Sequence, residues 1–272
     1  KLFQFGNKGY DNIKAGLNWQ YEQNFGRGLI FDITLPTQNT TSQALRPRSF
    51  RDIPALNNLS AFVENKLDAD IGNTGLMLVT GVRFTNMFLD QRAGRKNIFV
   101  SEPRLNLEYT FLDAEDMRIS VSGGWGLSYK TPSLLYLYPD DAYFDRVSLL
   151  KKSENETGSI SLMTTDILSD LANSSLKPAR SNKVEAGLNF RFFGIKGNVN
   201  WFRELHTDEF GFSSIPHFMH YNTFSVPSGA TDLKYENGKV WFTDAEGVRH
   251  TAQAADETYI ATYLSPVNKG RT

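Results

Sequence analysis

The sequence predicts an all-β fold, specifically part of the wall of an antiparallel transmembrane β-barrel with about seven or eight strands and long extracellular loops. Three observations lead to this expectation. Apolar and polar residues alternate in several segments, which is the period of a strand with two different faces. These segments run for about 9 to 14 residues, near the 9 to 11 that cross a bilayer at a tilt. Short and long connections also take turns along the chain.

The first alternating segment, residues 13–23, shows the pattern clearly. Leu17, Trp19 and Tyr21 share one face, together with Ile13 and Ala15. The opposite face carries Lys14, Asn18, Gln20 and Glu22. We expect the apolar face to meet lipid and the polar face to line a lumen.

Six further segments repeat this alternation. They cover residues 59–67, 75–85, 103–111, 117–130, 183–192 and 195–201. A soluble sheet with a protein core on one side produces the same period. Segment length and the order of the connections favour the membrane interpretation.

The connections alternate strictly between short and long. The short ones are DADIGNTG, LDAED and FG, and the long ones cover residues 24–58, 87–101, 131–181 and 203 to the end. Outer-membrane barrels have short periplasmic turns and long outer loops, so this parity sets the orientation of each strand. Residues 28–35 predict either a ribbon inside the first long loop or an eighth wall strand, which would reverse the first strand.

Aromatic side chains gather near the two predicted ends of the wall. The four near the short turns are Tyr109, Phe111, Phe190 and Phe192, and those toward the other end are Phe84, Trp125 and Tyr129. Such girdles mark the two membrane interfaces of a barrel. The alternative is an ordinary protein core lined with aromatic rings.

The long loops contain local structure of their own. Ile160, Met163, Ile167 and Leu171 repeat at helical spacing and predict a short amphipathic helix. Asn237-Gly238 lies between strand-like flanks and predicts a two-residue hairpin, and residues 241–250 offer a second turn. We therefore expect the last loop to form a β-ribbon clear of the barrel.

Composition excludes several classes of protein. The 272 residues include 29 basic and 30 acidic side chains, so no excess of charge attracts nucleic acid, and we expect no nucleic-acid partner. The chain has no cysteine, which rules out disulfides, thiolate metal sites and a cysteine nucleophile. His217 and His220 are three residues apart, a spacing that suits a metal only on a helix or tight turn. We expect no metal, no cofactor and no enzymatic activity.

Three motifs carry a resemblance to a known family. Residues 59–67 and 76–84 resemble paired strands with Gly-x-Arg near the end of the second, and residues 102–139 resemble the hairpin that follows. Residues 173–190 resemble a Leu-Lys-Pro and Ser-x-x-x-Glu-x-Gly-Leu element. The matching residues of that element are Leu176, Lys177, Pro178, Ser181, Glu185, Gly187 and Leu188. In order and spacing, residues 12 to 205 resemble the barrel of TonB-dependent outer-membrane receptors.

The resemblance implies a barrel of about 22 strands, closed by a plug and located in the bacterial outer membrane. It implies TonB-energised, ligand-gated uptake of a small nutrient: a glycan, a peptide or a chelated metal. The expected partners are outer-membrane lipid, TonB acting through a plug region, and a surface lipoprotein. We expect residues 1–272 to be part of one barrel domain, with the plug outside this chain. The rival functions are a soluble extracellular β-sandwich that binds a ligand, and a passive porin.

The predicted extracellular loops carry the candidate ligand-binding residues. These are Tyr136, Tyr138, Tyr143, Asp140, Asp141 and Trp241. Aromatic faces beside carboxylates suit a sugar or a chelated cation. The alternative role of these side chains is to pack the loops against one another.

Charged residues on the predicted lumen face have two interpretations. The set comprises Arg83, Arg104, Glu108, Arg118, Glu185 and Arg191. They either pair with one another across strands or contact the plug. Neither role is catalytic.

Overall fold

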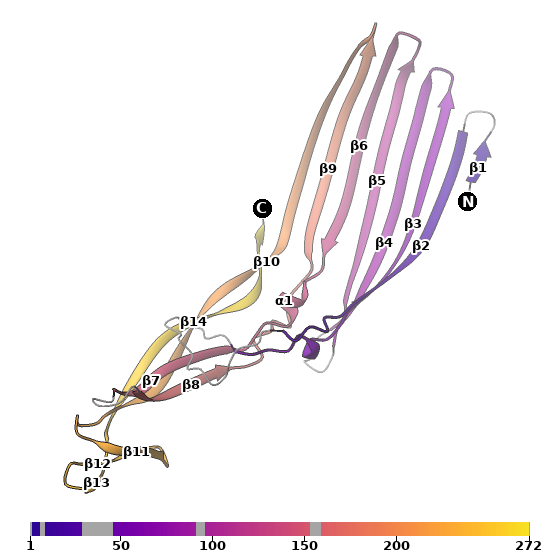
Figure 1. The fold of residues 1–272 in the computed structure, drawn as a ribbon. Helices are drawn as coiled ribbons and strands as arrows, with labels where there is room; N and C mark the ends of the chain where they lie inside the picture. Colours follow the sequence, from indigo (N-terminus) through magenta and orange to yellow (C-terminus); the bar gives the residue numbers. More distant parts are fainter. Residues whose placement is uncertain (1, 6–8, 29–45, 91–95, 153–158, 272) are drawn as a thin grey trace.

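Long antiparallel strands dominate the computed structural model, which describes residues 2–5, 9–28, 46–90, 96–152 and 159–271. Nine strands form one sheet in the order β1-β2-β3-β4-β5-β6-β9-β10-β14 (Figure 1). Their bounds are Leu2–Phe5, Gly9–Glu22, Leu56–Ile71, Thr74–Phe88, Ile98–Asp113, Met117–Lys130, Ala179–Phe192, Ile195–Ser225 and Gln253–Arg271. The all-β prediction is confirmed, and each predicted wall segment lies in one of these strands, apart from Gln23 at the end of the first.

The prediction for the end of the chain is right in part: an antiparallel ribbon forms, but it continues the wall sheet and does not stand clear of it. We expected a loop from residue 203 onward, but β10 continues to Ser225 and β14 returns beside it in register from Ser225↔Gln253 to Thr207↔Arg271. The alternation is weak here because residues such as Pro216 and His217 interrupt it. Together with the short strand β1, β14 brings the sheet to nine strands, where the sequence predicted about seven or eight.

Strand register collects the apolar residues on one face of the sheet. Leu17 pairs with Ala61, and Ala61 pairs with Phe84. Side chains of directly opposed residues share a face. Leu17 is 81% exposed and Trp19 is 69% exposed, as expected for a face without a protein layer over it. Within the described ranges, no second sheet covers this apolar face, which argues against a β-sandwich.

Short turns join the wall strands at one end. The turns β3–β4, β5–β6 and β9–β10 lie together at the top of Figure 1. In the last turn, Phe193 and Gly194 both have positive φ angles, 47° and 86°, as tight hairpin turns require. Most of residues 28–35 falls outside the described residues. Since β2 pairs directly with β3, no wall strand separates them.

Aromatic rings lie near these turns, as predicted. The Tyr109 and Phe111 rings contact edge to face with centroids 4.8 Å apart. The Phe190 and Phe192 rings lie 5.9 Å apart on β9. These four residues form one end of the apolar face.

The long connections form two smaller sheets. The hairpin of β7 (Ala142–Lys152) and β8 (Ser159–Leu168) occupies one long connection. The three-stranded sheet of β11 (Thr231–Glu236), β12 (Lys239–Thr243) and β13 (Arg249–Thr251) lies between β10 and β14. Its first turn is Asn237-Gly238, with positive φ at both residues, and the second predicted turn joins β12 to β13. Both predicted turns are confirmed.

The amphipathic helix predicted for residues 160–171 is wrong. Most of that stretch is strand β8, which contains Ile160, Thr164, Thr165 and Ile167, and β-branched residues favour strands. Ile160 and Ile167 are more than half exposed, so they form no buried helical stripe. The helices that the structure describes are short: a 3-10 turn at Phe50–Asp52 and α1 at Leu134–Leu137.

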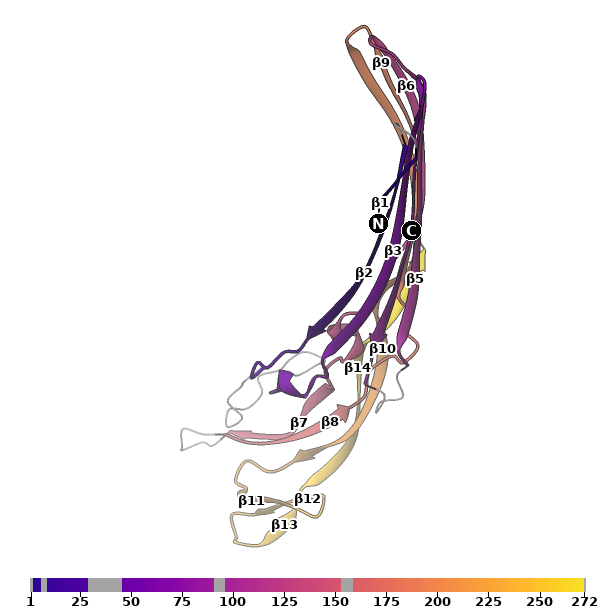
Figure 2. The ribbon, with the colours of Figure 1, turned by 90° about the vertical axis from the view of Figure 1, so that its right-hand side faces the viewer.

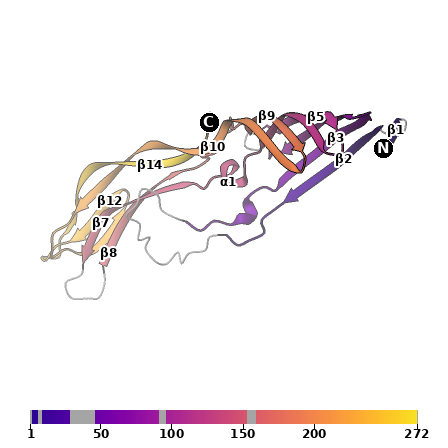
Figure 3. The same cartoon turned by 90° about the horizontal axis from the view of Figure 1, so that it is seen from above.

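The sheet is curved, and the β7–β8 hairpin lies on its concave side (Figures 2 and 3). The hairpin packs on the far part of β10 and β14, where Ala142, Phe144, Met219 and Ala261 are buried together. This small core holds the long connection against the wall. In the described part of the chain no helix is long and apolar enough to cross a membrane, a finding that does not bear on spanning by strands.

Candidate functional site

Five of the six candidate ligand-binding residues lie in one stretch, which runs from α1 into the start of β7. Tyr136 lies in α1, where its ring packs against Phe210 and Phe212 of β10 with centroid separations of 5.2 and 5.1 Å. These contacts position α1 against the wall. Tyr136 is therefore half-buried and has the packing role that we considered as the alternative.

Arg48, which comes from an earlier loop of the chain, binds to this stretch. Its guanidinium forms an ion pair with Asp140 and donates a hydrogen bond to the Tyr138 carbonyl oxygen at 2.9 Å. Burial lowers the pKa of Arg48, while the nearby Asp141 and Tyr143 act in the opposite direction. One cation thus contacts two of the predicted residues, Tyr138 and Asp140, and its pKa responds to the charges of two more.

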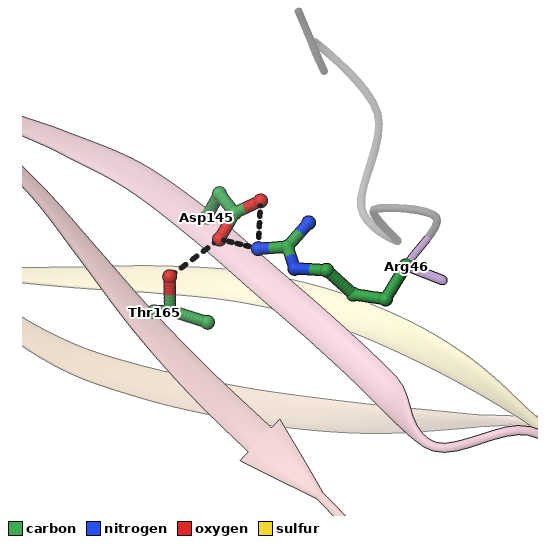
Figure 4. Close-up of polar contacts among 3 residues, drawn as sticks. All are labelled: Arg46, Asp145 and Thr165. Atoms are coloured by element: carbon green, nitrogen blue, oxygen red, sulfur yellow. Dashed lines mark hydrogen bonds and ion pairs between the residues drawn. The ribbon is translucent and has the colours of Figure 1, made fainter. Parts of the chain in front are cut away.

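A second arginine from the same segment, Arg46, binds the β7–β8 hairpin (Figure 4). Arg46 Nη2 donates to both carboxylate oxygens of Asp145 at 2.7 and 2.8 Å, and Thr165 Oγ1 donates to Asp145 Oδ1 at 2.6 Å. The Asp145 side chain is only 2% exposed. The Arg46 guanidinium also lies 5.0 Å from the Tyr143 ring centre. We call Arg46, Arg48, Asp140 and Asp145 the arginine clasp.

The two histidines of HFMH diverge. A strand sends side chains three positions apart to opposite faces. His217 lies 2.7 Å from Asp166 and stacks on Phe144, whereas His220 Nδ1 lies 3.0 Å from Thr258 Oγ1. They cannot share a metal ion through the spacing considered above. Within the described ranges, no group of three His, Asp or Glu side chains could hold a metal ion.

Family comparison agrees with this architecture. The family model for the TonB dependent receptor-like β-barrel matches residues 2–234, which include eight of the nine wall strands in full or in part. The chain belongs to this receptor family. Searches of curated proteins and of solved structures find no match. Members of the family are transporters of the bacterial outer membrane rather than enzymes.

Trp241 lies apart from the other candidate residues of this receptor. It sits on β12 of the three-stranded sheet, at the far end of β10 and β14 (Figure 1). The Arg249 guanidinium lies 4.6 Å from its ring centre, a distance that allows cation–π attraction. The structure therefore divides the predicted site between two places.

The polar face of the receptor wall contains ion pairs that cross between strands. Arg118 lies 3.9 Å from Glu108 and 3.6 Å from Asp113, and Arg191 lies 3.7 Å from Asp113. Cross-strand pairing, one of the two hypotheses for these charges, is thus confirmed for Arg118, Arg191 and Glu108. Arg83 and Arg104 form no ion pair with the residues that the structure describes.

Sequence reasoning missed the arginine clasp because its members are far apart in the chain. Arg46 and Asp145 are separated by 99 positions, and nothing local links them. The one local signal for the clasp is the pair of arginines in RPRS, residues 46–49. These arginines are far from the tyrosines in sequence and come close to them only in the folded chain. A charged segment inside a long loop is more often a solvated face, so the signal was weak.

Proposed function

We propose that this chain is part of a single barrel domain that takes up a nutrient across the outer membrane with energy delivered through TonB. The observation that carries the proposal is the match to the receptor barrel across residues 2–234, on a wall with one exposed apolar face. A barrel wall with a polar lumen and large external loops suits a ligand too large for free diffusion. The nutrient classes that we consider are a glycan, a peptide and a chelated metal.

We infer that the ligand meets the receptor at the clasp. Tyr138, Tyr143 and Asp141 are each partly exposed there, and Tyr136 and Asp140 build the framework around them. Trp241, at the far sheet, offers a second contact for a large ligand or for a surface lipoprotein. TonB would act through a plug region.

An uptake experiment tests the proposal. Cells that depend on the receptor are supplied with labelled oligosaccharides, oligopeptides or ferric chelates, with and without a functional TonB. We expect one class to accumulate only in cells that have both the receptor and TonB. Accumulation that persists without TonB would instead support a passive porin, and accumulation without the receptor would exclude the proposal.

A further inference from the structure

A groove of about 380 Å³ crosses the polar face of the wall over β5, β6 and β9. Its charged lining consists of Arg83, Glu102, Arg104, Lys183, Glu185 and Glu204. The groove lies on the wall, separate from the clasp and from the far sheet. Gly124 on β6 lies at the floor of the groove and puts no side chain into it. A Cβ atom at this position would lie only 2.8 Å from Glu185 Cγ.

Two arginines of the groove are diagonal neighbours. Arg83 lies opposite Glu102, and Arg104 lies opposite Gly81, on the same pair of strands. Diagonal neighbours in a sheet have their Cα atoms about 7–8 Å apart, within reach of long side chains. Gly126 lies on the other side of Arg104, so small residues flank this guanidinium on both neighbouring strands.

Each acid of the groove has a contact of its own, and Glu102, although opposite Arg83 in the strand register, makes no ion pair with it. Glu102 accepts a hydrogen bond from the Tyr129 N–H at 2.9 Å, and Glu185 lies 2.8 Å from Lys183. Glu204 accepts a hydrogen bond from Ser181 Oγ at 2.5 Å. In the part of the chain that the structure describes, neither Arg83 nor Arg104 has a carboxylate within ion-pair distance.

We propose that Arg83 and Arg104 form a binding subsite for a carboxylate or phosphate group inside the barrel. Two neighbouring cations with no carboxylate in ion-pair contact repel each other, and an anion between them removes that repulsion. The planar guanidinium presents paired donors that fit both oxygens of a carboxylate or phosphate. The anionic group belongs either to a soluble ligand or to another segment of the same receptor.

The inference rests on the proposed function only for the placement of the groove in the lumen. Binding is measured on the complete receptor in detergent, where no transport occurs. The subsite can therefore fail while TonB-dependent uptake is retained, and uptake can fail while the subsite binds.

The probe is citrate, titrated by calorimetry at low ionic strength into the purified complete receptor. We expect the double variant R83Q/R104Q to bind citrate at least tenfold more weakly than the unaltered receptor. The matched control is K14Q/K196Q, which removes two exposed cations of the same face, neither ion-paired with a described residue. It should change citrate binding less than twofold.

Thermal unfolding of the same samples distinguishes the two sources of the anion. If citrate raises the Tm of the receptor but not that of R83Q/R104Q, the subsite is open to soluble ligands. If citrate does not bind and R83Q/R104Q lowers the Tm by several degrees more than K14Q/K196Q, an internal carboxylate occupies the pair. Citrate binding and Tm values that are the same in both double variants would overturn the proposal.

Discussion

At the residue scale, the buried ion pair of the clasp is the contact that decides how the loops are held. Asp145 accepts hydrogen bonds from Arg46 and Thr165 and has almost no exposure to solvent. Removal of one partner from such a pair leaves a charge with a desolvation cost and no compensation. The clasp should therefore fail locally, without unfolding the wall.

Substitution of Asp145 tests this expectation. We expect Asp145→Ala to weaken docking of residues 46–53 on the hairpin by roughly 2–3 kcal/mol, less than the ~3–5 kcal/mol of a fully buried pair. The estimate is lower because the Arg46 side chain is 23% exposed. Hydrogen exchange of β7 amides should accelerate by roughly 30- to 150-fold, since about 1.4 kcal/mol corresponds to a factor of ten.

Two variants serve as controls for this measurement. Thr165→Ser retains the hydroxyl donor and should exchange like the unaltered receptor. The double variant Arg46→Met with Asp145→Leu replaces the pair by apolar groups and should recover much of the lost protection. Unchanged exchange in Asp145→Ala would show that the pair does not hold the loop.

At the element scale, one carboxylate, that of Asp244, holds the turn between β12 and β13 through its hydrogen bonds. Asp244 Oδ1 accepts the Val248 N–H at 2.7 Å, and Asp244 Oδ2 lies 2.6 Å from His250 Nε2. The Val248 N–H is the main cause that lowers the pKa of Asp244 below its usual 3.8, and His250 adds to it. A lowered pKa means that the folded turn favours the ionised form.

This linkage predicts an acid-sensitive turn. The stabilisation is present above the unfolded pKa of 3.8 and is lost as pH falls through the lower folded value. Exchange protection of the Val248 amide, corrected for the intrinsic rate, should be constant from neutral pH to about pH 4 and then decrease. Asp244→Asn should show no such step, and a step in that variant would assign the effect to another group.

The elements differ in how well sequence predicts them, for physical reasons. The wall strands are predictable because one wet and one apolar face impose a period of two, as in residues 13–23. Strand β8 is not, because the apolar residues of 160–171 fall by chance at helical spacing, while pairing with β7 decides the outcome. The far half of β10 is also not predictable from sequence. Its apolar residues do not alternate with polar ones: Met219 is buried, and its apolar neighbour Phe218 is exposed.

The candidate site is likewise predictable from sequence only in part. Aromatic and acidic side chains at 136–143 are visible locally, and the structure brings Tyr138 and Asp140 into contact with Arg48, and Tyr143 with Arg46. The arginines come from another loop, so only tertiary structure reveals them. Residue type alone groups Trp241 with them, and the fold places it on a different sheet.

At the scale of the whole molecule, the two faces of the wall should respond differently to the same substitution. Leu107 lies on the apolar face opposite Leu78, and its neighbour Asn106 lies on the polar face opposite Val79. An arginine on the lipid face near the middle of a bilayer costs about 2–4 kcal/mol, whereas lumen positions tolerate charge.

We therefore expect Leu107→Arg to reduce the folded, membrane-inserted fraction of the complete receptor, and Asn106→Arg to leave it nearly unchanged. Heat-modifiable migration on gels, after alkaline washing of outer membranes, measures that fraction. Leu107→Ala is the control for loss of the side chain alone. Equal losses in both arginine variants would contradict the assignment of the faces.

The unusual length of β10 determines which part of the receptor a molecule outside the cell would contact first. Its 31 residues have a contour length of roughly 100 Å at ~3.3 Å per residue, whereas ~9–11 residues cross the bilayer. With the short turns on the periplasmic side, as proposed, the three-stranded sheet at its end would lie well beyond the lipid. An antibody or a phage that approaches an intact cell would touch Asn237-Gly238 before it reached the clasp, so a short peptide tag inserted in that turn should be detectable without permeabilisation.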